Sequence, residues 1–176
     1  MGRACDETIS TNLIAPAALT VAVMPLLLAA ERPRIVNVGS SSHLRAAAVE
    51  PELVGDTRRD RTLRAYGQSK LGLMQVSRVL RACAPSLVVH DVHPGIVWTP
   101  MLRRQFGPVA ELLRRVGLQR RLFKAPERGA EMVLAAALAA PHRPAAGAPA
   151  YFVEGKLNPA LASPESCDEH SARAMW

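Results

Sequence analysis

Apolar residues are most concentrated near the start of the chain. Leu13 to Ala30 contains no charged residue, and a helix that is hydrophobic all round usually lies in a protein core. We therefore expect a buried helix here, with Thr11-Asn12 as its N-terminal cap. The run is also just long enough to span a membrane. Leu28-Ala29-Ala30 resembles a signal cleavage site, but the acidic Asp6 and Glu7, and no basic cluster, precede the run.

Short β-branched runs and helical periodicity alternate along the rest of the chain. Strands are predicted at Ile35–Val38, Leu87–Val92 and Tyr151–Val153, and helices at Tyr66–Cys83, Pro126–Ala139 and Ser166–Trp176. Residues 43–64 are expected to form a polar loop, and 99–124 a basic, helix-prone segment broken at Gly107-Pro108 and Gly117. This order of strands and helices predicts an α/β fold with a parallel sheet and right-handed crossovers.

Composition and charge narrow the class of protein only a little. The 176 residues are 49% hydrophobic, which suits one domain with a core. A net charge of +7 suits an anionic lipid surface, a phosphorylated cofactor or nucleic acid. Since no Lys/Arg block alternates with aromatic residues, we expect no nucleic-acid binding. Cys5, Cys83 and Cys167 fit neither a disulfide framework nor a metal site, so we expect free thiols in a reducing, cytoplasmic compartment.

The candidate chemistry centres on Tyr66 and Lys70. Four residues apart on a helix, the two side chains lie on one face. A nearby positive charge stabilises a phenolate, so the two form a candidate proton-transfer pair. In open parallel sheets, ligands bind beyond the carboxyl ends of the strands. Ser40 and His93-Pro94-Gly95 follow the first two predicted strands, which brings them to the same edge of the sheet.

Each of these features also has a purely structural interpretation. A Tyr/Lys pair at this spacing is common on solvated helix faces. Asn12 can be only a helix cap, Ser40 only a turn residue, and Pro94-Gly95 only a tight turn.

Four motifs occur in a recognisable order. They are Thr11-Asn12 before a helix, the stretch 35–41, Tyr66-Gly67-Gln68-Ser69-Lys70, and the stretch 93–99. Together they resemble the short-chain dehydrogenase/reductase superfamily. Ser-Lys-Leu after the tyrosine, the His-Pro-Gly turn and residues 123–130 resemble its retinol dehydrogenase-like branch. The resemblance implies a Rossmann-like sheet and hydride transfer between a nicotinamide cofactor and a small apolar alcohol, aldehyde or ketone.

The resemblance also implies a role for each candidate residue. Tyr66 would give or take the proton, Lys70 would stabilise its phenolate and hold the nicotinamide ribose, and Ser40 would hydrogen-bond the substrate oxygen. Asn12 would hold a water that relays protons to Lys70. The implied cofactor is NAD(P), with NADP favoured, and the implied cofactor-binding residues are Tyr66, Lys70, Pro94, Gly95, Val97 and Thr99.

The chain departs from the family in its first half. It contains no Thr-Gly-x-x-x-Gly-x-Gly turn to grip a pyrophosphate and no Asn-Asn-Ala-Gly segment. It begins where the family's fourth helix begins. We therefore expect residues 1–176 to form one incomplete domain, the truncated carboxyl half of the fold, with three of seven strands and a bare inner sheet edge.

Residues 100–125 are expected to form a substrate lid. Between 101 and 124, seven Lys or Arg residues are interspersed with apolar ones. Such a segment can lie on an anionic membrane surface, or it can cover an apolar substrate with its polar face in solvent.

Three hypotheses about function follow. The first is an NAD(P)-dependent oxidoreductase. In the second, the chain is catalytically inert and associates with a full-length relative, or with itself, through the helices at 13–30 and 66–83. The third is a membrane-associated protein anchored by Leu13–Ala30.

Overall fold

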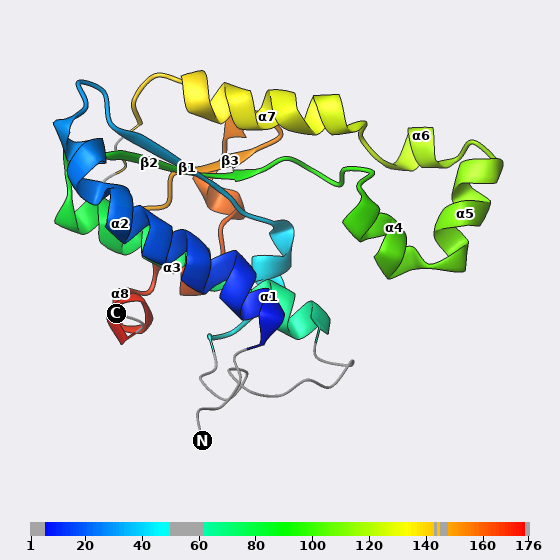
Figure 1. Ribbon diagram of the computed structural model, residues 1–176, viewed down its shortest axis with the longest axis horizontal. Helices are drawn as coiled ribbons and strands as arrows, with labels where there is room; N and C mark the ends of the chain where they lie inside the picture. The colour runs from blue at the N-terminus through cyan, green and yellow to red at the C-terminus, as the bar shows by residue number, and fades with distance from the viewer. Residues whose placement is uncertain (1–5, 50–61, 143, 145–147, 175–176) are drawn as a thin grey trace.

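A four-stranded sheet forms the middle layer of the protein, with helix α7 on one face and helices α2 and α3 on the other (Figure 1). The computed structural model describes residues 6–49, 62–142, 144 and 148–174. In chain order the elements are α1 (Glu7–Ile9), η1 (Ser10–Ile14), α2 (Ala15–Ala29), β1 (Arg34–Val38), η2 (Ser41–Arg45), α3 (Thr62–Cys83), β2 (Val88–His93), α4 (Pro100–Phe106), α5 (Pro108–Arg115), α6 (Gln119–Leu122), α7 (Pro126–Leu138), β3 (Tyr151–Val153), β4 (Lys156–Leu157), η5 (Pro159–Leu161), η6 (Pro164–Cys167) and α8 (Glu169–Ala174). Of these, η1 is a π turn and the other η elements are 3₁₀ turns.

The strands lie in the order β1-β2-β3-β4. β1 pairs in parallel with β2, and β2 with β3, while α3 and α7 make the two crossovers. The predicted α/β fold with a parallel sheet is therefore confirmed. β4 is a short antiparallel partner of β3 that the sequence pattern does not predict. It is reached through a turn in which Glu154 and Gly155 both have positive φ.

A chain of polar contacts ties α3 to the sheet. The Asn37 amide donates to Ser77 Oγ at 2.8 Å, and Ser77 Oγ donates to the Asp91 carboxylate at 2.6 Å. Arg81 forms an ion pair with the other Asp91 oxygen at 3.2 Å. Asp91 is fully buried, so burial raises the pKa of its carboxyl, and the Arg81 charge opposes that shift. The surrounding core is apolar and consists of Ile9, Leu13, Ala65, Leu73, Val76, Leu80, Leu87 and Val89.

Helix α7 is attached to the opposite face by its last carbonyl groups. The Arg34 guanidinium donates to two of them, at 3.1 and 2.6 Å, one being the carbonyl of Ala136. His90 Nδ1 lies 2.8 Å from the same Ala136 oxygen. Carbonyls in the last turn of a helix lack helical partners, so these contacts both satisfy them and fix the helix on the sheet.

The prediction of a buried helix over Leu13–Ala30 is wrong. The helix runs from Glu7 to Ala29, and only 6% of its most apolar window is buried. Within α2 no residue is buried, and Leu26 is 75% exposed. An all-round apolar helix does not show which face will find a partner, and no described residue covers the outer side of this one. By length and composition it could cross a membrane, which is weak evidence, since core helices and signal sequences share those properties.

The predicted cap of this helix is also wrong. The Asp6 carboxylate accepts the backbone N–H groups of Thr8 and Ile9 at 2.8 and 3.2 Å, so the helix begins earlier than expected. Thr11 and Asn12 lie inside it, in the π turn η1.

Most other boundaries agree with the sequence pattern. The predicted breaks in the basic segment fall at Gly107 and Gly117, both of which have positive φ and separate α4, α5 and α6. α3 begins at Thr62, so Tyr66 lies in its second turn. The expected loop over 43–64 starts with the 3₁₀ turn η2, and residues 50–61 lie outside the described part. The expected last helix is divided into η6 and α8.

Helices α4, α5 and α6 extend away from the sheet as a separate arm (Figure 1). They connect to the body at a parallel bridge between Val97 and Lys124. The segment predicted as a lid is therefore a projecting unit joined to the body near the carboxyl end of β2.

Candidate active site

Ser40 lies just beyond the carboxyl end of β1. Gly39 continues the ladder by donating to the Val92 carbonyl at 2.8 Å, after which the chain turns into η2. Ser40 is the N-cap of that turn: its Oγ accepts the Ser42 N–H and donates to Ser42 Oγ, both at 3.2 Å. The serine is thus held at the edge of the sheet where parallel α/β folds bind ligands.

A close approach at Gly67 brings this turn against α3. A Cβ on Gly67 would lie 2.8 Å from the Ser42 carbonyl oxygen, which is closer than real Cβ atoms come. Glycine therefore lets η2 sit directly on the helix, at the residue that follows Tyr66. The fold brings the Ser40 turn and the Tyr66 turn of α3 together.

Lys70 connects the same helix to the end of β1. Its ammonium donates to the Val38 carbonyl at 2.9 Å and lies 5.6 Å from the centre of the Tyr66 ring. The side chain is half-buried, and burial lowers the pKa of the ammonium. Among the described residues, no carboxylate pairs with it. Lys70 therefore places a positive charge beside the Tyr66 ring and at the carbonyl of Val38, two residues before Ser40. The ammonium has further N–H groups that the Val38 carbonyl does not use.

Asn12 reaches this region from the first helix. Its amide lies 3.3 Å from Ser69 Oγ and donates to it, and Ser69 Oγ donates to the Tyr66 carbonyl at 2.8 Å. Asn12 lies in the π turn, and π turns occur frequently at functional sites. The cap interpretation of Asn12 is therefore wrong, and the residue contacts α3 between Tyr66 and Lys70.

The turn after β2 supplies the other predicted residues. Gly95 follows Pro94 and has φ +86°, a conformation that L side chains rarely adopt. A Cβ there would lie 2.6 Å from the Lys124 ammonium. Thr99 Oγ1 accepts the Leu102 N–H at 3.3 Å, which makes it the N-cap of α4.

Val97 joins this turn to the base of the arm formed by α4, α5 and α6. It pairs with Lys124 in the isolated bridge, and a Cβ on Gly129 would come within 2.7 Å of its Cγ2. The Lys124 ammonium in turn pairs with Glu154 at 2.6 Å. The turn after β2 therefore connects the sheet, the arm of α4, α5 and α6, and α7.

His43 is not among the residues that the motifs indicate, yet it contacts this site. The ring is fully buried, and its Nδ1 lies 2.5 Å from the Ser40 carbonyl oxygen. The one signal in the sequence is its position three residues after Ser40. Its second partner is Ser163, 120 residues away, which local patterns do not reveal.

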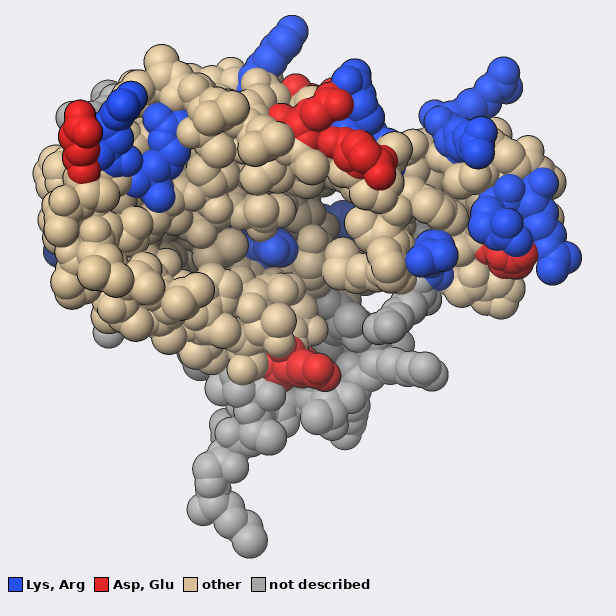
Figure 2. Space-filling view, turned by 45° about the horizontal axis from the view of Figure 1, so that its top comes forward, with Lys and Arg blue, Asp and Glu red and all other residues tan. Residues whose placement is uncertain are grey.

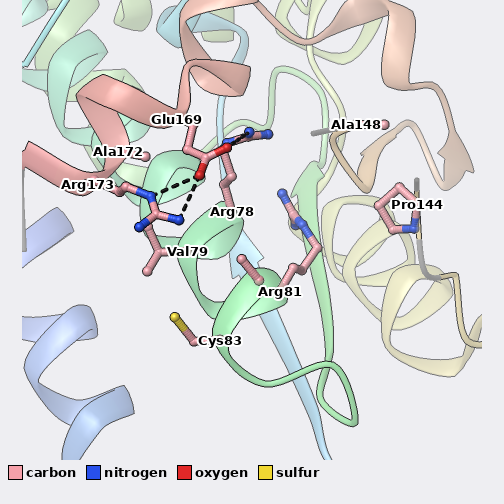
Figure 3. Close-up of a pocket in the computed structure, with 10 residues that line it drawn as sticks. Arg78, Val79, Arg81, Cys83, Pro144, Ala148, Glu169, Ala172 and Arg173 are labelled. Carbon is pink, nitrogen blue, oxygen red and sulfur yellow. Dashed lines mark hydrogen bonds and ion pairs between the residues drawn. The ribbon is translucent and has the colours of Figure 1, made fainter. Parts of the chain in front are cut away.

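A cavity of about 370 Å³ lies at the other end of α3 (Figure 3). Among its lining residues, Arg78 and Arg173 both contact the Glu169 carboxylate, at 3.2 and 2.8 Å. The cavity begins twelve residues after Tyr66, or roughly 18 Å along the helix axis. It is therefore separate from the Tyr66 site, and its charges are already paired.

Comparison with known proteins gives one distant likeness. No family model matches the chain. The chain is 29% identical over 171 residues to human retinol dehydrogenase 13, a short-chain dehydrogenase/reductase. The match covers 90% of this chain and 48% of that protein, so the chain spans about half the length of the curated relative it matches. At this distance the likeness supports the superfamily at most.

Proposed function

We propose that this chain carries the catalytic residues of an NAD(P)-dependent oxidoreductase of the short-chain dehydrogenase/reductase type. Its substrate would be a small apolar alcohol, aldehyde or ketone. One observation carries the proposal most: Lys70 reaches from α3 to the Val38 carbonyl, beside the Tyr66 ring and next to the Ser40 turn. Two independent elements thus bring hydroxyl groups and a positive charge to the edge of the sheet where such folds bind ligands.

The proposed chemistry of these residues is a proton transfer. In the direction of reduction, the Tyr66 hydroxyl gives its proton to the carbonyl oxygen, and the Lys70 charge stabilises the phenolate that remains. The Ser40 O–H, which donates to Ser42 Oγ in the free protein, turns to donate to the same oxygen as negative charge develops there. Asn12 would hold a water that returns protons toward Lys70. A reduced nicotinamide, when bound, supplies the hydride.

The residues present fit one half of the cofactor. Lys70 has N–H groups beyond the one given to Val38, and these suit ribose hydroxyls. Pro94, Gly95, Val97 and Thr99 lie at the neighbouring strand end, where the nicotinamide would bind. The sequence contains no glycine-rich turn for the pyrophosphate, so the residues present do not fit the pyrophosphate and adenosine half of the cofactor. The net charge of +7 favours NADP over NAD, because NADP carries an additional phosphate.

The test is turnover with an apolar aldehyde such as decanal or all-trans-retinal, followed by NADPH oxidation. Tyr66→Phe keeps the ring and removes the proton donor, so we expect it to lower kcat by about 10²- to 10⁴-fold. The chain's other tyrosine gives a matched control. Tyr151 is buried and its hydroxyl has no partner among the described residues, so Tyr151→Phe is expected to keep the activity. Equal activity in wild type and Tyr66→Phe would remove Tyr66 from this role.

A second candidate is association without catalysis. Its support is the exposed apolar surface of α2, where Leu19 and Leu26 are 64% and 75% exposed. The second helix expected to take part in association, residues 66–83, lies in α3. Much of its apolar surface is already buried against the same chain. We expect any dimer to form mainly through α2. Sedimentation of wild type and of Leu26→Glu, together with the activity assay, separates the candidates. A wild type that sediments as a monomer and oxidises NADPH would exclude association without catalysis.

The arm formed by α4, α5 and α6 is proposed as the substrate lid. Its position beside the turn after β2 supports this role, since a segment there can close over a ligand at the strand ends. We also propose that the same arm contacts an anionic membrane surface. The protein would then be cytoplasmic and associated with a membrane.

A further inference from the structure

The imidazole of His43 joins two distant parts of the chain. It lies in η2, is fully buried, and has a contact at each ring nitrogen. Nδ1 is 2.5 Å from the Ser40 carbonyl oxygen, and Nε2 is 3.1 Å from the backbone nitrogen of Ser163. Ser163 belongs to the segment that leads into η6. The ring therefore bridges the end of β1 and the carboxyl-terminal part of the protein.

These two contacts define which nitrogen carries the proton. A backbone N–H can only donate, so Nε2 must hold a lone pair to accept the Ser163 N–H. In the neutral ring the proton is then on Nδ1, which donates to the Ser40 carbonyl. Burial lowers the pKa of the imidazole, although the Ser40 contact and the nearby Glu165 act in the opposite direction. The ring is thus neutral at pH 7, in the Nδ1–H form.

A third contact fixes the plane of the ring. His43 meets Tyr151 of β3 edge to face, with the ring centres 5.2 Å apart. Tyr151 is itself 1% exposed. The imidazole is therefore held by η2, by β3 and by the segment before η6, so it cannot turn without breaking a contact.

We propose that His43 is a positioning residue for Ser40, holding the Ser40 carbonyl so that the Ser40 hydroxyl keeps its direction at the edge of the sheet. The same carbonyl also accepts the His43 backbone N–H at 3.2 Å. The Ser40–Ser41 peptide is the pivot between β1 and η2, and rotation of this peptide would move Ser42, whose N–H and Oγ hold the Ser40 hydroxyl. The role of Ser40 in catalysis rests on the proposed function, whereas the positioning of Ser40 by His43 does not.

The tautomer can be measured directly on the wild-type protein. Nitrogen-15 NMR of the imidazole at pH 7.5 is expected to show a protonated Nδ1 and an unprotonated Nε2. An Nε2–H form of His43 would overturn the proposal without any need for a variant.

Two substitutions then separate the two hydrogen bonds. His43→Asn places an amide nitrogen near the position of Nδ1 and keeps a donor for Ser40. His43→Gln reaches the position of Nε2 and keeps an acceptor for Ser163. We expect the Ser40 NMR signals to shift more in His43→Gln than in His43→Asn. We also expect kcat to fall by up to about 10²-fold in His43→Gln, with KM little changed, since small misplacements of catalytic groups can cost that much.

The outcomes distinguish the two proposals. If the wild type shows no turnover, the proposed function fails, and the tautomer and the Ser40 signals still decide the positioning role. If the two variants shift the Ser40 signals equally, or if His43→Asn is the more damaging, the positioning role is contradicted.

Discussion

Three histidines lie wholly or largely inside the protein, and for each of them burial lowers the pKa of the imidazole. They are His43, His90 and His93. His90 is the clearest case, because Nδ1 contacts the Ala136 carbonyl and Nε2 is buried without a partner among the described residues. The charges of Arg34 and His142 lower its pKa further, whereas backbone contacts with Ala136 and His142 raise it. A second proton on this ring would therefore be buried and close to positive charge.

These shifts predict a loss of stability in acid. Between the lowered folded pKa values and the unfolded value near 6.5, the unfolded chain binds more protons than the folded one, so the free energy of unfolding rises with pH across that window and falls as pH drops through it. Urea unfolding at pH 7.5, 6.5 and 5.5 measures this. We expect the lowest stability at pH 5.5 and a flatter pH dependence in His90→Gln. A pH dependence equally steep in the wild type and in His90→Gln would contradict the burial of the His90 ring.

The candidate residues differ in how far sequence could identify them. Tyr66 and Lys70 are four residues apart, so helical geometry alone places them together. Ser40 follows from its place at a strand end. His43 could not be identified in this way, because its function depends on Ser163, which only the folded chain brings to it.

At the scale of elements, the docking of η2 on α3 determines whether Ser40 meets Tyr66. Gly67→Ala tests that docking, since the added Cβ would lie 2.8 Å from the Ser42 carbonyl oxygen. Alanine gains up to about 1 kcal/mol of helix propensity over glycine, but overpacking costs typically about 1–3 kcal/mol. We expect net destabilisation of roughly 1 kcal/mol and a loss of turnover, measured by urea unfolding and by NADPH oxidation.

Gly39→Ala is the matched control for that change. Gly39 adjoins Ser40 in the chain, as Gly67 adjoins Tyr66. A Cβ on Gly39 would meet Val92 and Tyr151 at ordinary distances of 3.6 and 3.7 Å. Its stability is expected to match or exceed that of the wild type. If Gly67→Ala is as stable and as active as Gly39→Ala, then η2 does not sit on α3 as closely as described.

The sequence predicts whether a segment forms a helix or a strand more readily than it predicts how deeply that segment is buried. The glycines at 107 and 117 break the basic segment where expected, because positive φ is easily reached only by glycine. The first helix was expected from its apolar run, but its exposure was not, because burial depends on what packs against each face. Its cap at Asp6 precedes the apolar run, which starts at Leu13, so the run alone did not show where the helix begins.

At the scale of the whole molecule, positive charge gathers on the projecting arm (Figure 2). Glu111 is the one acidic residue between 101 and 124, and it pairs with Arg114 and Arg115. Beside these charges, Leu112 and Val116 are 60% and 63% exposed. Apolar residues flanked by arginine are typical of segments that bind anionic bilayers.

Sedimentation with vesicles containing phosphatidylserine tests this contact. We expect binding that weakens at high salt, and a clear loss of binding in Arg120→Glu/Arg121→Glu. Arg32→Glu/Lys156→Glu changes the net charge equally at exposed positions outside the arm and is expected to bind like the wild type. Equal losses in both variants would mean that net charge, and not this arm, governs binding.

The central claim is that Ser40, Tyr66 and Lys70 form one site that fits the nicotinamide half of the cofactor. Titration with reduced nicotinamide mononucleotide, followed by amide NMR shifts, tests it most directly because this ligand lacks the adenosine half. The account predicts the largest shifts at Ser40, Tyr66, Lys70 and Gly95. No shifts at these residues, or shifts confined to the distant cavity at Arg78, would contradict it.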